Sequence, residues 1–346
     1  MKTNLFGLTP DQLKSVVTSL GLPAFTATQL ADWMYKKRVA TFLEMTNLSK
    51  VSREKLEVDY CVSLTPATKV QTSTDGTKKY LYPTQTAKFI EAAYIPDADR
   101  ATLCVSTQIG CKMGCLFCMT GKQGFQGNLS AGEIVNQVQS LPEFEKLTNI
   151  VYMGMGEPMD NVEAVLNSIE IMTSEKGYGW SPKRITVSTI GIIPAMITFL
   201  EKCQAHLVVS LHSPFDAERQ EIMPIQSVYP ITEVISEIRK WDLGRQRRIS
   251  FEYIMFKGVN DTPRHANELV RLLNGIKCRI NLIRFHAIPD TPLEGTSEAG
   301  IVFFQNHLKA KGLIVTIRAS RGEDIFAACG LLSTKELLKK QQETDF

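Results

Sequence analysis

The sequence lacks any apolar run long enough to cross a membrane. Its longest uncharged stretch, residues 185–200, is shorter than the roughly 20 residues that a spanning helix needs, and Gly191 and Pro194 interrupt it. The opening residues, MKTNLFGLTPDQLK, also lack the apolar core of a secretory signal. We therefore expect a soluble, cytoplasmic protein without membrane contact, in which thiols stay reduced.

An excess of charge of one sign is also missing. The chain has 39 Lys and Arg against 36 Asp and Glu, which gives a net charge of +3. This mildly basic balance permits a nucleic-acid partner without requiring one. Neither end is low in complexity, and 44% of the 346 residues are hydrophobic. The composition therefore predicts one large globular domain plus an accessory module.

Histidine is scarce, whereas cysteine is not. The chain has five histidines and eight cysteines, and in a cytoplasmic protein such cysteines are more typical of ligands, catalysts or core positions than of disulfides. Three of them, Cys111, Cys115 and Cys118, have the spacing C-x3-C-x2-C, and Cys104 stands seven residues upstream. The spacing predicts a metal centre.

Three clustered thiolates favour an iron–sulfur cluster over zinc. A closed structural zinc site needs four ligands, and the nearest histidine in the sequence is His206. Zinc with a remote fourth ligand stays open as the alternative. A cubane cluster held by three cysteines leaves one iron without a protein ligand, and that open iron is a place for chemistry.

From residue 101 onward, strand-like segments alternate with helical ones. The predicted strands cover 101–106, 148–153, 184–188, 206–211, 249–255, 279–285 and 313–317. The predicted helices begin at Ser130 and Asp160 or cover 192–203, 230–241, 263–274 and 298–311. This alternation predicts an α/β fold with a parallel sheet. About six such units predict a partial (β/α)6 barrel of the TIM type.

The first hundred residues predict two smaller parts. Thr9, Pro10 and Gln12 form a capping box with proline at the first helical position, so one helix begins here. Further helices are expected at Ala27–Lys37 and near 50–57, and residues 65–104 have β-strand patterns. We expect four parts: a helical accessory domain at 1–60, a β-rich extension at 61–100, the barrel at 101–318, and a C-terminal loop and helix carrying Cys329 at 319–346.

Polar residues recur where the predicted barrel strands end. Gly156 and Glu157 follow the second strand, Ser188 ends the third, and His212 follows the fourth. Each alone is more often a turn or capping residue. Because catalytic groups of barrels gather at the C-terminal ends of strands, their recurrence predicts a binding site there.

The cysteine spacing, with Phe117 just before the last cysteine, resembles the radical S-adenosylmethionine (SAM) superfamily. That resemblance implies that the open iron binds the methionine part of SAM, and that an electron from the cluster cleaves SAM to a 5′-deoxyadenosyl radical. A narrower resemblance, from about residue 5 to 340, is to the dual-specificity rRNA/tRNA adenine-C2 methyltransferases. It rests on the motifs CVSTQIGCKMGCLFCMTGKQGF, MGMGEPMDN, PKRITVSTIG, SLHSPF, INLIRFHAIP and TIRASRGEDIFAACGLL.

The resemblance implies a role for each matching residue. One [4Fe–4S] cluster per chain would bind Cys111, Cys115 and Cys118. Cys329 would be the cysteine that becomes methylated, Cys104 its partner thiol, and Glu91 the proton acceptor. The residues implied to bind SAM are Gly156, Glu157, Ser188, Ser210, Leu211, His212 and Asn281.

The resemblance also implies a reaction. Adenine C2 is electron-poor, whereas a thiolate is a good nucleophile, so Cys329 would take the methyl group of one SAM. A second SAM would supply the radical that activates this methyl group for addition to C2. Cys104 or Glu91 would then remove the C2 proton, and a Cys104–Cys329 disulfide would release the product. The implied substrates are adenosines of 23S rRNA, in the peptidyl-transferase region, and of tRNA, 3′ of the anticodon.

Several alternatives stay open. A similar branch methylates adenine C8 in rRNA and confers antibiotic resistance, and a metal-containing RNA-binding protein without turnover is a third possibility. From the residues alone, Cys329 in FAACG is equally typical of a small, buried helix end. We expect Ser320–Asp324 to be a mobile loop that carries Cys329 inward. The resemblance further implies an RNA-binding N-terminal domain, a reductant such as flavodoxin or ferredoxin, and a monomer.

Overall fold

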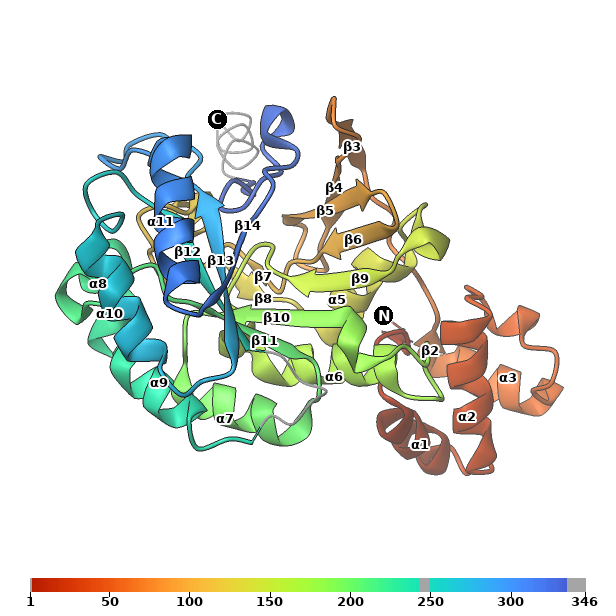
Figure 1. Cartoon of the computed structure of the whole chain (residues 1–346). Helices are drawn as coiled ribbons and strands as arrows, with labels where there is room; N and C mark the ends of the chain where they lie inside the picture. The colour runs from red at the N-terminus through yellow and green to blue at the C-terminus, as the bar shows by residue number, and fades with distance from the viewer. Residues whose placement is uncertain (1, 243–248, 335–346) are drawn as a thin grey trace.

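The computed structural model describes residues 2–242 and 249–334, and its centre is a ten-stranded sheet (Figure 1). The strand order is β14-β13-β12-β11-β10-β9-β6-β5-β4-β3, and the seven strands from β14 to β6 are parallel. The parallel strands are β6 (Arg100–Cys104), β9 (Asn149–Tyr152), β10 (Ile185–Thr189), β11 (His206–Ser210), β12 (Ile249–Met255), β13 (Cys278–Arg284) and β14 (Ile314–Ile317).

Helices cover the outer face of the parallel strands. They are α5 (Ala131–Gln139), α6 (Val162–Thr173), α7 (Ile193–Lys202), α8 (Asp216–Ile222), α9 (Ile231–Ile238), α10 (Pro263–Leu273) and α11 (Glu298–Ala310). The six strands from β6 to β13 are each followed by helix, so the partial (β/α)6 barrel is confirmed, and β14 adds one parallel strand at its edge. Every residue of β12 is buried, as expected where helices cover one face and the barrel interior lies on the other.

Three antiparallel strands extend the sheet beyond β6. They are β3 (Lys69–Thr72), β4 (Lys78–Pro83) and β5 (Phe89–Asp97), and they account for the predicted β-rich segment. The shorter pieces are β1 (Thr3–Asn4), β2 (Tyr60–Cys61), β7 (Gln108–Ile109), β8 (Gly127–Asn128), α4 (Met119–Gln123) and the 3-10 turns Phe42–Glu44, Phe144–Lys146, Pro158–Asn161, Pro182–Arg184, Pro224–Ser227 and Glu323–Ile325.

The N-terminal module is helical, as predicted, with one correction. Its helices are α1 (Pro10–Ser19), α2 (Phe25–Ala31) and α3 (Lys50–Asp59), and the capping box of α1 is present. The helix predicted at Ala27–Lys37 is present, but its second half, Asp32–Lys36, is a π-helical turn rather than α-helix. There the Lys37 amide donates to the Asp32 carbonyl, five residues back. The wider turn buries Met34 and Tyr35 together, and the Tyr35 hydroxyl donates to the Leu8 carbonyl at 2.7 Å.

The module shares a hydrophobic core with the barrel helices. Val135 of α5 and Ile171 of α6 belong to the same buried cluster as the apolar residues of α1 to α3. Gly7 and Gly132 touch through their backbones, so closely that a Cβ on Gly7 would lie 2.1 Å from the Gly132 Cα. The module is therefore held tightly against α5 and α6.

The four domain limits stay a prediction, and the expected C-terminal helix lies outside the described residues. Within residues 2–242 and 249–334, no helix combines the length and the apolar character needed to cross a bilayer.

Candidate active site

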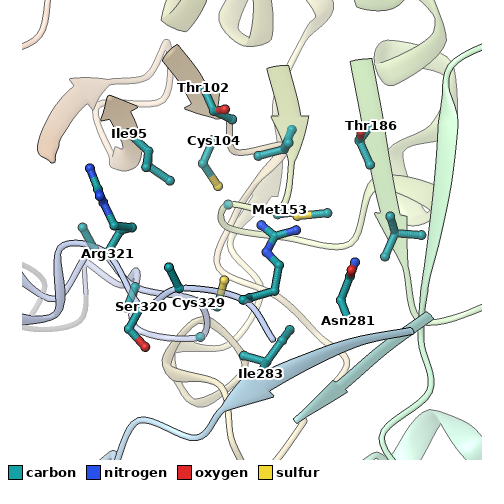
Figure 2. Close-up of a pocket in the computed structure, with 18 of the residues that line it drawn as sticks. Ile95, Thr102, Cys104, Met153, Thr186, Asn281, Ile283, Ser320, Arg321 and Cys329 are labelled. Atoms are coloured by element: carbon teal, nitrogen blue, oxygen red, sulfur yellow. The ribbon is translucent and has the colours of Figure 1, made fainter. Parts of the chain in front are cut away.

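A cavity of about 490 Å³ opens on the inner side of the barrel strands (Figure 2). Its walls come from β5, β6, the start of α4, β9 to β14 and the segment after β14. Four of the residues singled out from the sequence line it: Cys104, Cys118, Asn281 and Cys329. The structure thus brings together residues that lie up to 225 positions apart in the chain.

Cys104 and Cys329 face each other across this cavity. Cys104 is the last residue of β6 and is buried, whereas Cys329 lies in a turn after β14 and is exposed. Figure 2 shows the two sulfurs pointing toward one another, and both are free thiols. Burial raises the pKa of Cys104 to about 12. The cavity walls also raise the pKa of Cys329 by desolvation, while the Arg318 guanidinium opposes this rise.

Cys111, Cys115 and Cys118 lie in the loop between β7 and α4. Burial raises the pKa of Cys111 to about 12 and that of Cys115 well above its usual value, and the neighbouring thiols of the set add to both shifts. The three thiols are therefore close enough to sense one another's charge. Among the described residues, no three His, Cys, Asp or Glu side chains surround one point as a single metal ion requires. In a cubane cluster each thiolate binds a different iron, so the sulfurs need not converge.

Gly156 and Glu157 lie in the loop after β9. Gly156 has φ +100°, and a Cβ on it would lie 2.5 Å from the Gln108 Cβ, so only glycine fits this close approach. The Glu157 carboxylate accepts hydrogen bonds from the Thr189 hydroxyl at 2.6 Å and from the Ile190 amide at 3.0 Å. Burial raises the pKa of Glu157 to about 7. Protein donors thus already hold the carboxylate that the resemblance assigns to SAM.

The turn after β11 holds His212 in a fixed and neutral state. His212 has φ +57°, and its Nδ1 accepts from the Ile254 amide at 3.0 Å, which leaves the proton on Nε2. Burial, helped by the Arg219 charge, lowers the pKa of His212 to about 3. Its ring packs edge-on against Phe117, with ring centroids 4.8 Å apart, and this contact joins the turn to the cysteine loop.

The remaining residues implied to bind SAM lie at or near the same end of the sheet. Ser188 and Ser210 are half-buried near the ends of β10 and β11, and Leu211 is fully buried. The Asn281 amide oxygen accepts from the Thr316 hydroxyl at 2.7 Å, and its side chain points into the cavity (Figure 2). Only Asn281 of these four lines the cavity.

Glu91 is not brought to the cavity. Its carboxylate pairs with Lys79 Nζ at 3.1 Å and accepts from the Ser333 amide at 3.0 Å. It therefore holds the chain four residues beyond Cys329, and its role as proton acceptor stays a prediction. No local pattern could predict this contact, because it joins positions 242 residues apart.

The segment that carries Cys329 is anchored on both sides. Upstream, Asp75 in the β3–β4 turn accepts from the Gly322 amide at 2.9 Å and pairs with Arg321 Nε at 3.4 Å. Downstream, the Met119 amide donates to the Gly330 carbonyl at 2.8 Å. The hypothesis of a mobile Ser320–Asp324 loop missed these anchors, because they come from β3, β4 and α4 rather than from the loop itself.

Removing the Asp75 carboxylate should loosen this segment. We expect Asp75→Ala to expose Arg321 to trypsin and to slow the methyl transfer that the resemblance implies by about 10- to 100-fold, since a displacement of about 1 Å at reacting groups costs about 10² in rate. Rates of proteolysis and of methyl transfer check this. Asp59→Ala, at an exposed position on α3, is the matched control. Wild-type rates in both assays would contradict the anchoring role.

Further groups, to which the sequence analysis assigned no role in the reaction, lie near the thiols. Arg318 and His286 line the cavity, and the buried Glu252 of β12 pairs loosely with Arg318, with Nη1 and Oε1 4.0 Å apart. Arg318 directly follows β14, so its place at a strand end was the available signal.

Comparison with known proteins matches both parts of the chain. Residues 3–62 match the family described as the ribosomal RNA large subunit methyltransferase N-terminal domain, and residues 105–272 match the radical SAM superfamily. A "Probable dual-specificity RNA methyltransferase RlmN" of Parabacteroides distasonis is 55% identical over 96% of this chain and 97% of that protein. The "Dual-specificity RNA methyltransferase RlmN" of Syntrophus aciditrophicus is 41% identical over 98% and 99%.

A solved structure agrees with these matches. The crystal structure of a radical SAM methyltransferase from Sphaerobacter thermophilus superposes with a TM-score of 0.87, at 38% identity, over 95% of this chain and 99% of that one. The resemblance drawn from the motifs is thereby confirmed along nearly the whole chain: this chain belongs to the family of dual-specificity RNA methyltransferases called RlmN, within the radical SAM superfamily.

Proposed function

We propose that this protein methylates C2 of adenosine in 23S rRNA and in tRNA through a methylated Cys329. One observation carries the proposal: Cys104 and Cys329 face each other in one cavity that Cys118 also lines. A thiol that accepts a methyl group, a thiol that resolves it and a cluster ligand are the three groups that this reaction needs. The names of the relatives support RNA as the substrate.

The cysteine loop fits one [4Fe–4S] cluster. Cys111, Cys115 and Cys118 would hold it, and the positive iron would favour the thiolate forms that burial disfavours in the free chain. Gly156, Glu157, Ser188, Ser210, Leu211, His212 and Asn281 would bind SAM. When bound, the cluster and SAM supply the one-electron chemistry that an unactivated carbon requires.

Cys329 would act as the methyl acceptor. It is the exposed member of the thiol pair, so a methyl donor in the cavity reaches it directly. The Arg318 guanidinium favours its thiolate, which is the nucleophilic form. The anchors at Asp75 and at Gly330 keep the sulfur in one place while it accepts the methyl group and later passes it to the base.

Cys104 would resolve the intermediate. It lies on the opposite wall, so its thiolate can attack the Cys329 sulfur and form the Cys104–Cys329 disulfide that frees the product. Because Cys104 lines the cavity and Glu91 does not, we also assign the removal of the C2 proton to Cys104. This proton then passes to the carbon that leaves the Cys329 sulfur when the Cys104 sulfur attacks it. Glu91 would then act through the Ser333 amide, as a positioning residue.

The remaining partners follow from the substrate. A base within folded RNA must be extruded to enter this cavity. Arg100, Arg279 and Arg321 at its walls would meet phosphates, and the N-terminal module would add an RNA-binding surface. We further propose a cytoplasmic monomer, since rRNA and tRNA are found there, with flavodoxin or ferredoxin as the reductant.

The regiochemistry of the product tests the function. The chain, reconstituted anaerobically with iron and sulfide, is incubated with unmodified rRNA and tRNA fragments, SAM and a reductant. Digestion to nucleosides and chromatography against standards should give 2-methyladenosine from both RNAs, and none without reductant. 8-Methyladenosine would instead establish the C8 reaction. If no methylated adenosine forms, the result would instead favour a metal-containing RNA-binding protein without turnover.

A further inference from the structure

Glu252 is a buried carboxylate that the reaction described above does not use. It lies in the middle of β12, with 8% of its surface exposed. In the register of the sheet it stands between Ser210 of β11 and Asn281 of β13, and Asn281 in turn pairs with Thr316 of β14. Residues that stand side by side on neighbouring parallel strands point to the same face of the sheet. These four polar residues therefore form one row across four neighbouring strands. Asn281 and Thr316 line the cavity, and Glu252 and Ser210 continue the row on the same face of the sheet.

One oxygen of this carboxylate has no hydrogen-bond donor. Glu252 Oε1 is buried, and no side chain or backbone amide within the described residues donates to it. The nearest cationic atom, Arg318 Nη1, is 4.0 Å away, which is too far for a hydrogen bond. Buried carboxylate oxygens are rarely left unpaired, because the loss of water is then uncompensated. This oxygen is therefore an acceptor for which the described part of the chain supplies no donor.

The backbone around Glu252 holds this acceptor in place. Its carbonyl accepts from the amides of Leu211 and His212 at 3.0 and 3.3 Å. The turn that follows Ser210 is thus tied directly to Glu252. A bound molecule that contacts both Ser210 and Asn281 therefore lies next to the Glu252 carboxylate between them.

We propose that Glu252 binds the adenosyl group of SAM by accepting a hydrogen bond from a ribose hydroxyl. The inference rests on the proposed function, which assigns Ser210 and Asn281 to SAM. The neighbours of Glu252 in the row are hydroxyl and amide groups, which suit a sugar edge better than a cation. The Asn281 amide oxygen already accepts one hydrogen bond, from Thr316, and Glu252 is the charged acceptor of the row. Glu252 is the acceptor that a ribose diol requires.

Binding of SAM analogues to the full-length, cluster-loaded chain tests this role without turnover. Calorimetry would compare S-adenosylhomocysteine with its 2′-deoxy and 3′-deoxy forms, in the wild type and in Glu252→Gln. A hydrogen bond to a charged acceptor predicts that the wild type binds one deoxy form about 10- to 100-fold more weakly. Glu252→Gln should bind S-adenosylhomocysteine correspondingly more weakly and should discriminate the deoxy forms by no more than about threefold.

Control variants separate this effect from a folding defect. Glu221→Gln, at an exposed position on α8, should retain the wild-type pattern. Melting curves would verify that Glu252→Gln is folded, and Glu252→Ala, which removes the acceptor entirely, should also lose the discrimination. If Glu252→Gln keeps the wild-type preference, or raises only the KM for RNA, the assignment to SAM is overturned. A wild-type chain that binds no S-adenosylhomocysteine would instead overturn the proposed function itself.

Discussion

Cys329→Ala should abolish methyl transfer to RNA, with a loss of at least about 10³-fold. Removing the nucleophile of a covalent mechanism leaves no other group to carry the methyl, and the opposing thiol, Cys104, is buried where Cys329 is exposed. The substitution leaves the cysteine loop and the strand ends untouched, so iron content and SAM binding should match the wild type. Transfer of a labelled methyl group to rRNA and tRNA, measured beside iron content, checks both expectations.

The control for this variant is a cysteine outside the cavity. Cys278 of β13 belongs to the main core cluster, on the face opposite to Asn281, and Cys278→Ala removes a sulfur of comparable size. It should keep methyl transfer within about threefold, with at most a modest loss of stability. Persistent methylation by Cys329→Ala would exclude a methyl-cysteine intermediate.

Cys104→Ala should trap the protein on its RNA. If Cys329 carries the carbon that adds to C2, and Cys104 supplies the thiol that releases it, the variant reaches the covalent stage and stops there. We expect one adduct per chain and less than about 1% of wild-type turnover. Denaturing gels should show the protein shifted by the RNA, and mass spectrometry after nuclease digestion should find the nucleotide on the peptide that contains Cys329.

The double variant provides the matching control. Cys104→Ala combined with Cys329→Ala should form no adduct, because the attachment point is missing. Multiple turnovers by Cys104→Ala at the wild-type rate would assign both the proton transfer and the release step to another group. Glu91, held by Lys79 and the Ser333 amide, would then be the first residue to examine.

The sequence predicted the barrel well because its signals are local. Alternating strand and helix patterns placed all seven parallel strands within about two residues of their observed limits. The short helix α8 was missed: it has seven residues and follows directly on the turn after β11, so its pattern is too brief to recognise. The π-helical turn at Asp32–Lys36 was missed as well, because only the tertiary contacts of Met34 and Tyr35 favour the wider turn.

The site was predictable only in part. The cysteine spacing and the strand-end pattern pointed to Cys118 and Asn281, whereas the roles of Cys104 and Cys329 came only from the family resemblance; the fold brings all four to one cavity. The contacts that hold them were out of reach, since they join distant segments. Asp75 meets Gly322 across 247 positions, and no local pattern marks either residue as an anchor. Glu252 lies within a strand and not at its end, so no motif singled it out. Only the register of the sheet places it between Ser210 and Asn281.

The N-terminal module shares a hydrophobic core with the helices α5 and α6, and this determines whether the protein or the RNA changes conformation when they bind. With Gly7 against Gly132 and Tyr35 against Tyr178, the module packs directly against the barrel helices, which disfavours a swing of the module toward a substrate. The RNA must therefore change shape to reach the cavity, and the energy of that distortion depends on the RNA rather than on the protein. Selection among adenosines then depends on how readily each RNA releases the target base from its stack.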